Sequence, residues 1–186
     1  LGGAGLFLRS LQQVQAVDPG FGREPAAIMT FMIPATRFSE DEGRLYVSRL
    51  LARFRQLPSV ERVGIIDNLH MNPLNSQTMG FNVDGHTPPE DQEAFIASRA
   101  AVDAAFFDAA GIRVLRGRNF ADGDLPDAPQ VAIISEAMAQ RFWPGGDAVG
   151  RLVRTPSPDT ADLLVIGVAS DAKIRTLGEA RADLGV

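Results

Sequence analysis

The chain has 186 residues, 45% of them apolar, with a net charge of −5 and a pI near 5.0. This composition supports a buried core for one large domain or two small ones, and it excludes the basic surface that nucleic acids require. There is no cysteine, which excludes disulfides and cysteine-based chemistry, and the only imidazoles are His70 and His86.

The first eight residues, LGGAGLFL, are apolar and uncharged. A spanning helix needs roughly 20 apolar residues, so this run cannot cross a bilayer alone. It also lacks the basic start and the cleavage site of a signal peptide. Two interpretations stay open: a short buried segment, or the outer end of a transmembrane helix.

Residues 26–67 predict a strand, a helix and a second strand. The apolar run at 26–33 is typical of a buried strand. Ser39 and Glu42 form a capping box that predicts a helix over 39–57. Residues 60–67 again have strand character. Short links between these elements indicate an α+β fold that contains a split βαβ unit.

The middle of the chain predicts short strands separated by turns. A strand is predicted at 79–83, closed by the Asp84-Gly85 turn, and another at 96–102. Residues 86–93 are acidic and contain two prolines, which predicts an exposed loop.

A short helix and a loop are predicted next. Asp103 can cap a helix that runs to Ala110, and Gly111 can terminate it. Residues 112–115 are expected to be extended, and residues 117–128 form a loop rich in aspartate and glycine.

The last third of the chain predicts a sheet with one helix. Residues 131–134 are typical of a buried strand, and Ser135 is expected to cap the following helix. Pro144-Gly145-Gly146 should end that helix. The segments 149–154 and 163–170 are predicted to form a strand pair.

No sequence motif indicates a catalytic, cofactor or metal site. The chain lacks a phosphate-binding loop, a dinucleotide fingerprint, a nucleophile elbow and a zinc-protease motif. Ser135 follows a strand and opens a helix, where capping is the expected role. His70 and His86 lie in loop-like stretches without an evident third ligand.

The acidic loop offers only a partial metal motif. Asp122 and Asp124 share the D-x-D spacing of calcium loops, but Ile133 stands where the EF-hand needs glutamate. A solvated turn is therefore expected. Three other carboxylates could serve as a catalytic pair, although nothing in the sequence brings two of them together: Asp67, Asp103 and Asp108.

Seven segments occur in an order that is typical of one family. They are GAGLFLRSL (3–11), DPGF (18–21), LPSV (57–60), FNVDG (81–85), AAFFDAAGIRVLRGRNF (104–120), VAIISEAMAQRFWPGGDAVGR (131–151) and VIGVASDAK (165–173). Together they closely resemble the MacB-like periplasmic core domain of ABC-transporter permeases, in its MacB/FtsX-type, acidobacterial-type variety. Ser59 stands where these permeases often have glycine.

The resemblance implies a division of the chain into four parts. Residues 1–24 would be the end of a transmembrane helix and a linker, and residues 25–116 the first half of a porter-like α/β subdomain. Residues 117–170 would be an inserted small β-rich, sabre-like subdomain. Residues 171–186 would lead toward a second half that this sequence does not include.

The resemblance also implies a function. The domain would lie on the periplasmic side of the bacterial inner membrane. Its N-terminal segment would connect it to that membrane. The domain would act with an ABC ATPase subunit or domain, and either transmit ATP-driven motion or handle substrate. It would be non-catalytic and need no cofactor, with room for an extracytoplasmic protein or lipid partner.

Two other functions stay open from the sequence. One is a free-standing extracytoplasmic module that binds a peptide, lipid or lipoprotein. The other is a hydrolase that uses the scattered Asp and Ser residues, which would require a cleft lined by carboxylates of perturbed pKa.

The family motifs contain the residues for which a structural role or a partner contact is expected. Three of their glycines are predicted to need a positive φ or a close backbone approach. The residues are Arg9, Asp18, Pro19, Gly20, Phe21, Gly117, Arg118, Phe120, Pro144, Gly145 and Gly150.

Overall fold

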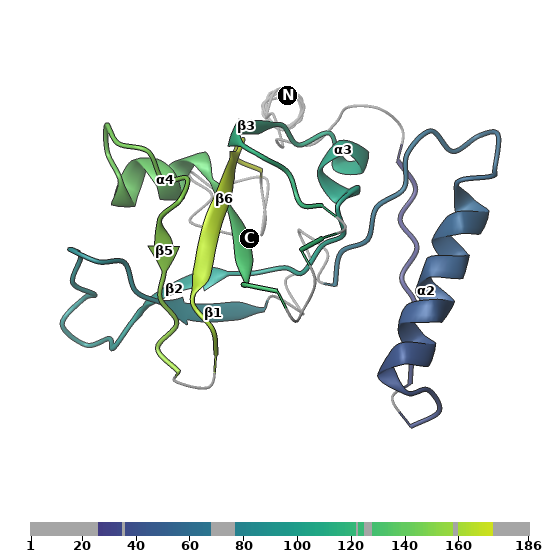
Figure 1. The fold of residues 1–186 in the computed structure, drawn as a ribbon, viewed down its shortest axis with the longest axis horizontal. Coiled ribbons are helices and arrows are strands. Elements are labelled where there is room, and N and C mark those ends of the chain that lie inside the picture. The colour runs from purple at the N-terminus through teal and green to yellow at the C-terminus, as the bar shows by residue number, and fades with distance from the viewer. Residues whose placement is uncertain are drawn as a thin grey trace, which may run out of the picture.

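The fold is α+β (Figure 1). A computed structural model describes residues 26–34, 36–67, 77–121, 123–124, 128–157 and 160–172. The expectations for residues 1–25 and 173–186, including the membrane-helix end, fall outside these ranges. The elements in chain order are α2 (Glu40–Phe54), β1 (Thr78–Phe81), β2 (Phe95–Ser98), α3 (Phe106–Ala110), β3 (Val114–Gly117), β4 (Val131–Ser135), α4 (Glu136–Phe142), β5 (Leu152–Val153) and β6 (Leu163–Ala169).

Helix α2 begins with the predicted capping box. The Ser39 hydroxyl accepts a hydrogen bond from the Glu42 N–H, and the Glu42 carboxylate accepts one from the Ser39 N–H at 2.8 Å. Both contacts satisfy amide groups that a helix start leaves unpaired. The helix ends at Phe54, earlier than predicted, because tight turns such as Gln56 N–H to Arg53 C=O replace its last turn.

The strand predicted at 26–33 is wrong. These residues are extended but belong to no strand, and within the described chain they pair with no neighbour. A strand requires a partner for its N–H and C=O groups, so an apolar run alone does not make one. Ile28 and Met32 are 68% and 89% exposed, although Ile33 lies against Gly43 of α2.

Residues 60–67 form only part of the predicted strand. A single bridge pairs Ile66 with Val102. Asp103 was expected to cap α3, but its carboxylate instead accepts the Ile65 N–H at 3.0 Å, and Ala105 occupies the N-cap. Gly111 ends α3 with a φ of 68°, as predicted.

Within the described residues the main sheet has four strands, in which β6 pairs with β3, β4 and β5. Strands β4 and β6 are parallel and are connected through α4, while β3 and β5 run antiparallel to β6. Ser135 caps α4 through a hydrogen bond from the Met138 N–H at 3.1 Å, as predicted. The predicted pairing of 149–154 with 163–170 is confirmed, although β5 is short.

The second sheet is the antiparallel pair β1–β2. It is joined to the main sheet where Asn82 bridges Arg154, with two backbone hydrogen bonds of 2.8 Å. This bridge links the two sheets between segments that are 72 positions apart in the sequence, Asn82 directly after β1 and Arg154 directly after β5.

Two hydrophobic clusters fill the faces of these sheets. The first joins the β1–β2 pair to α4 and the main sheet, and includes Phe81, Phe95 and Phe142. The second lies between α3 and the main sheet. Both clusters contain side chains from either side of residue 117, and β3 runs across the boundary predicted there. The four-part division of the chain stays a prediction.

Candidate functional site

The family-motif loop after β3 is built around an ion pair. Arg118 donates two hydrogen bonds to the Asp124 carboxylate, at 2.7 and 2.8 Å. The same carboxylate accepts the Ala121 N–H at 2.8 Å. Hydrogen bonds from Arg118 and Ala121 lower the pKa of Asp124 to about 2. Its carboxylate therefore closes a turn, which agrees with the expected turn, while Asp122 lies outside the described residues.

Gly117 occupies a position that no other residue fits. Its φ is 73°, and an added Cβ would overlap the backbone carbonyl of Ile166 on β6. The Arg118 N–H donates to this same carbonyl at 2.9 Å. Phe120 then packs into the second cluster, with its ring 6.1 Å from that of Phe107. This motif fixes how the loop leaves the sheet.

The turn from Pro144 to Gly150 also contacts β6, next to the residue that Gly117 approaches. Gly145 and Gly150 have φ angles of 73° and 85°, as predicted, and both would have free space around a Cβ. The Gly150 N–H donates to Val165 C=O at 2.8 Å. Ala148 is completely buried, which anchors an otherwise exposed turn.

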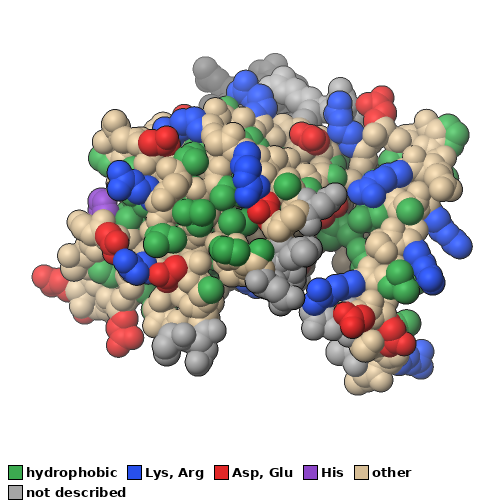
Figure 2. All heavy atoms as spheres, in the orientation of Figure 1, with side chains coloured by type: hydrophobic (Ala, Val, Ile, Leu, Met, Phe, Trp, Pro, Cys, Tyr) green, Lys and Arg blue, Asp and Glu red, His purple; other side chains and the backbone are tan. Residues whose placement is uncertain are grey.

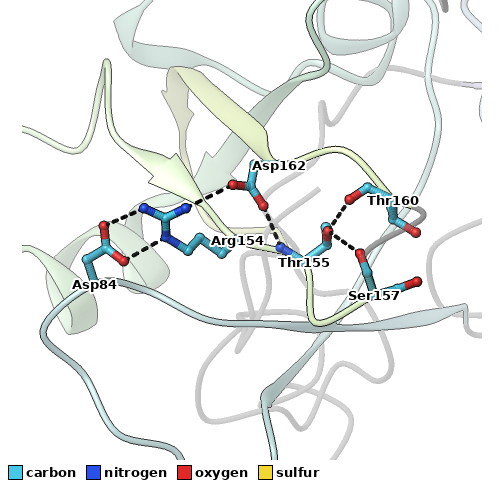
Figure 3. A network of polar contacts seen from close by, with 6 residues as sticks. All are labelled: Asp84, Arg154, Thr155, Ser157, Thr160 and Asp162. Atoms are coloured by element: carbon cyan, nitrogen blue, oxygen red, sulfur yellow. Dashed lines mark hydrogen bonds and ion pairs between the residues drawn. The ribbon is translucent and has the colours of Figure 1, made fainter.

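A polar network links the two sheets (Figure 3). The Arg154 guanidinium donates to both Asp84 oxygens, at 2.8 and 3.2 Å, and to Asp162 at 3.2 Å. Asp162 also accepts the Thr155 N–H. Hydrogen bonds from Arg154 and its positive charge lower the pKa of Asp84. Asp84 and Arg154 are 70 residues apart, and no sequence signal pointed to this contact.

An aromatic cluster lies where the β1–β2 loop joins its two strands and contacts the end of α4. The Phe142 ring is 5.4 Å from Phe81 and 4.9 Å from Phe95, and Arg141 covers the rings of Phe95 and Phe142. A hollow beside it has a volume of about 20 Å³. Ligand pockets for small molecules measure roughly 300–1,000 Å³, so this hollow does not hold an organic substrate.

The candidate catalytic residues have structural partners. Asp67 and Asp103 accept the N–H groups of Ala101 and Ile65. His86 donates from Nε2 to the Phe142 carbonyl at 2.8 Å. His70 lies outside the described residues. Among the described side chains, no group of three or more metal-binding residues lies together.

Charge is distributed unevenly over the surface (Figure 2). Arginine side chains gather along α2 and the turn that follows it, and acidic side chains on the loop between β1 and β2. Of the helices in the described ranges, none is long and apolar enough to span a bilayer.

Comparison with protein-family models identifies the family of this chain. A family model described as "MacB-like periplasmic core domain" matches residues 9–184. The chain is a member of that family. The match covers nearly the whole sequence, and it confirms the resemblance that the seven ordered segments indicate. No curated protein matches the chain.

Two solved structures are similar to this MacB-like domain. One is the periplasmic region of MacB from Actinobacillus actinomycetemcomitans, with 18% identity and a TM-score of 0.47, covering 68% of this chain and 52% of that chain. The other is the extracellular domain of the ABC-type transporter YknZ from Gram-positive bacteria, with 18% identity and a TM-score of 0.42, covering 67% and 57%. The chain thus spans about half of each.

The motif residues of this MacB-like domain lie in two groups within the described structure. Gly117, Arg118 and Phe120 surround the end of β3, whereas the Pro144–Gly150 turn follows α4. Arg9 and the segment 18–21 lie outside the described residues. Each described motif residue has a role in a turn or in packing.

Proposed function

We propose that this chain is the extracytoplasmic core domain of an ABC-transporter permease, and that it is non-catalytic. The observation that carries the proposal is the family match over residues 9–184. Family membership supports placement on the periplasmic side of the inner membrane. It also supports work with an ABC ATPase subunit or domain, which this domain would meet only through the membrane part of the permease.

The packing of the domain supports a mechanical role more than a chemical one. The backbone bridge at Asn82 and Arg154 joins the two sheets, and a shared aromatic cluster packs between them and α4. A body joined in this way can carry a displacement from one end to the other without deforming, because a close-packed core has low compressibility. We propose that transmission of ATP-driven motion is its main task, with substrate handling as the alternative.

A second function is favoured by one observation. Several large apolar side chains before and within α2 are exposed, among them Met32, Leu45 and Tyr46. Exposed apolar surface of this kind is typical of binding sites. A free-standing extracytoplasmic module that binds a peptide, lipid or lipoprotein would also present such a surface.

Fractionation of the full-length gene product separates these functions. Membranes are washed with alkaline carbonate, and the tagged protein is then solubilised and purified with its partners. The permease predicts an integral membrane protein that co-purifies with a P-loop ATPase. Recovery in the soluble extracytoplasmic fraction without an ATPase would favour the binding module.

A further inference from the structure

The loop between β1 and β2 has few contacts of its own. Residues 84–93, called the strap below, lie between buried Val83 and buried Ala94. All strap residues are exposed except the half-buried Pro88. Segments with little buried apolar surface open locally at much lower free energy than the whole fold.

The two ends of the strap are tied to each other. Phe81 pairs with Phe95 in the β1–β2 ladder, and the Asn82 side-chain amide donates to the Glu93 carbonyl at 3.4 Å. Pro88 and Pro89 restrict the backbone between these ends. A loop with joined ends and a stiff middle moves as a unit.

Two polar contacts fasten the strap to the rest of the domain, and they come from different elements. Asp84 pairs with Arg154, which follows β5, and His86 donates to the carbonyl of Phe142 at the end of α4. The Asp84 and Arg154 side chains are 74% and 50% exposed. Exposed ion pairs contribute little free energy each, so this fastening is weak.

Asn82, two residues before the strap, contains a buried side-chain oxygen. Among the described residues, nothing donates to Asn82 Oδ1, which is buried. An unpaired buried oxygen is unfavourable, and it gains a water partner when the segment opens.

We propose that residues 84–93 are a strap that detaches from the main sheet while that sheet stays folded, with Arg154 as its latch. Arg154 is the latch because its guanidinium holds both Asp84 and Asp162, and its backbone pairs with Asn82. Opening the strap uncovers the part of the Phe142 ring that His86 contacts. Next to the strap lies buried Val83, whose carbonyl accepts the His86 N–H. The inference concerns the conformational behaviour of this chain and does not rest on the proposed transport role.

A single introduced thiol measures the opening, because the chain contains no cysteine. The Val83→Cys variant places the thiol directly before the strap, at a side chain that is 3% exposed. The matched control is Val168→Cys on β6, at a completely buried position. The rate at which a water-soluble reagent labels each thiol is measured twice, once with Arg154 unchanged and once with Arg154→Gln added.

If the strap opens as proposed, the Val83→Cys thiol should react faster than the Val168→Cys thiol. Arg154→Gln should also accelerate labelling at position 83 about fivefold, as expected for loss of an exposed ion pair, with no change at position 168. Salt at about 1 M should accelerate labelling at position 83 only while Arg154 is present. Arg116→Gln, an exposed arginine on β3, should have no effect.

Equal labelling rates at the two positions would overturn the proposal, since the strap would then open only when the whole domain unfolds. Equal acceleration at both positions by Arg154→Gln would also overturn it. So would an unchanged rate at position 83. If Arg154→Gln does not fold, Asp84→Asn makes the same test, because it removes the strap contact and leaves the Asp162 contact in place.

Discussion

Residues 26–59 and residues 77–172 have similar proportions of apolar residues but are stabilised differently. In the second region, apolar side chains fill two clusters between sheets and helices. In the first, α2 is a well-capped helix, yet Leu45 and Tyr46 are both 50% exposed. Figure 1 shows α2 standing apart from the sheets. Local signals are therefore enough to form an element, but only tertiary packing makes it part of a core.

The largest expected difference between the regions concerns aromatic residues. Phe142→Ala removes a ring that contacts Phe81, Phe95 and His86, and should lower the free energy of unfolding by about 3–5 kcal/mol. Tyr46→Ala on α2 should change it by less than about 0.5 kcal/mol. Urea unfolding followed by circular dichroism measures both. Similar losses for the two variants would show that α2 is packed as tightly as the sheets.

Substitution of two glycines tests a crowded turn against an open one. Gly117→Ala forces a Cβ against the Ile166 carbonyl as well as an unfavourable φ, and should cost about 3 kcal/mol. Gly145→Ala has the same φ but free space, and should cost about 1 kcal/mol. Unfolding midpoints of the two variants give the comparison. Equal costs would mean that backbone conformation alone, and not the approach of β6, requires glycine at 117.

The same substitution, serine to alanine, can be made at one helix cap in each region. Ser135→Ala removes the cap of α4, which packs on the main sheet, and should lower the global free energy of unfolding by about 1 kcal/mol. Ser39→Ala removes the cap of α2 and should instead accelerate amide exchange within that helix. Hydrogen exchange with urea unfolding distinguishes the two. A global loss from Ser39→Ala would contradict the separation of the regions.

The smallest expected effect is a dependence on acid. The pKa of Asp124 is about 2 in the fold and 3.8 ordinarily, so its ion pair stabilises the fold above pH 3.8 and loses this contribution as the pH falls to about 2. The contribution should be about 1 kcal/mol, since Arg118 is half exposed. Asp124→Asn should therefore flatten the loss of stability between these pH values. An unchanged pH profile would exclude this ion pair as its source.

Local sequence patterns predicted the elements whose causes are themselves local. The capping box at Ser39, the cap at Ser135 and the positive φ at Gly117 follow from neighbouring residues, and the structure confirms each. Strand β4 was predicted as a buried strand from its apolar residues, and β6 as one member of a strand pair with the segment 149–154.

The failures involve partners that lie far away in the sequence. The run at 26–33 looked like β4 and β6, but it has no neighbouring strand within the described residues. The contact of Arg154 with Asp84 depends on how two sheets meet, and the turn motif that contains Asp84 does not indicate Arg154 as its partner. The family resemblance supplied the proposed function, since no site residue indicated one by chemistry.

The most direct test of the central claim is to measure on which side of the membrane this domain lies. A reporter enzyme that is active only outside the cytoplasm is fused after Val186 in the full-length protein, alongside a matched fusion to a reporter active only inside. The permease core domain predicts activity from the first fusion and none from the second. Activity from the cytoplasmic reporter alone would contradict the assignment.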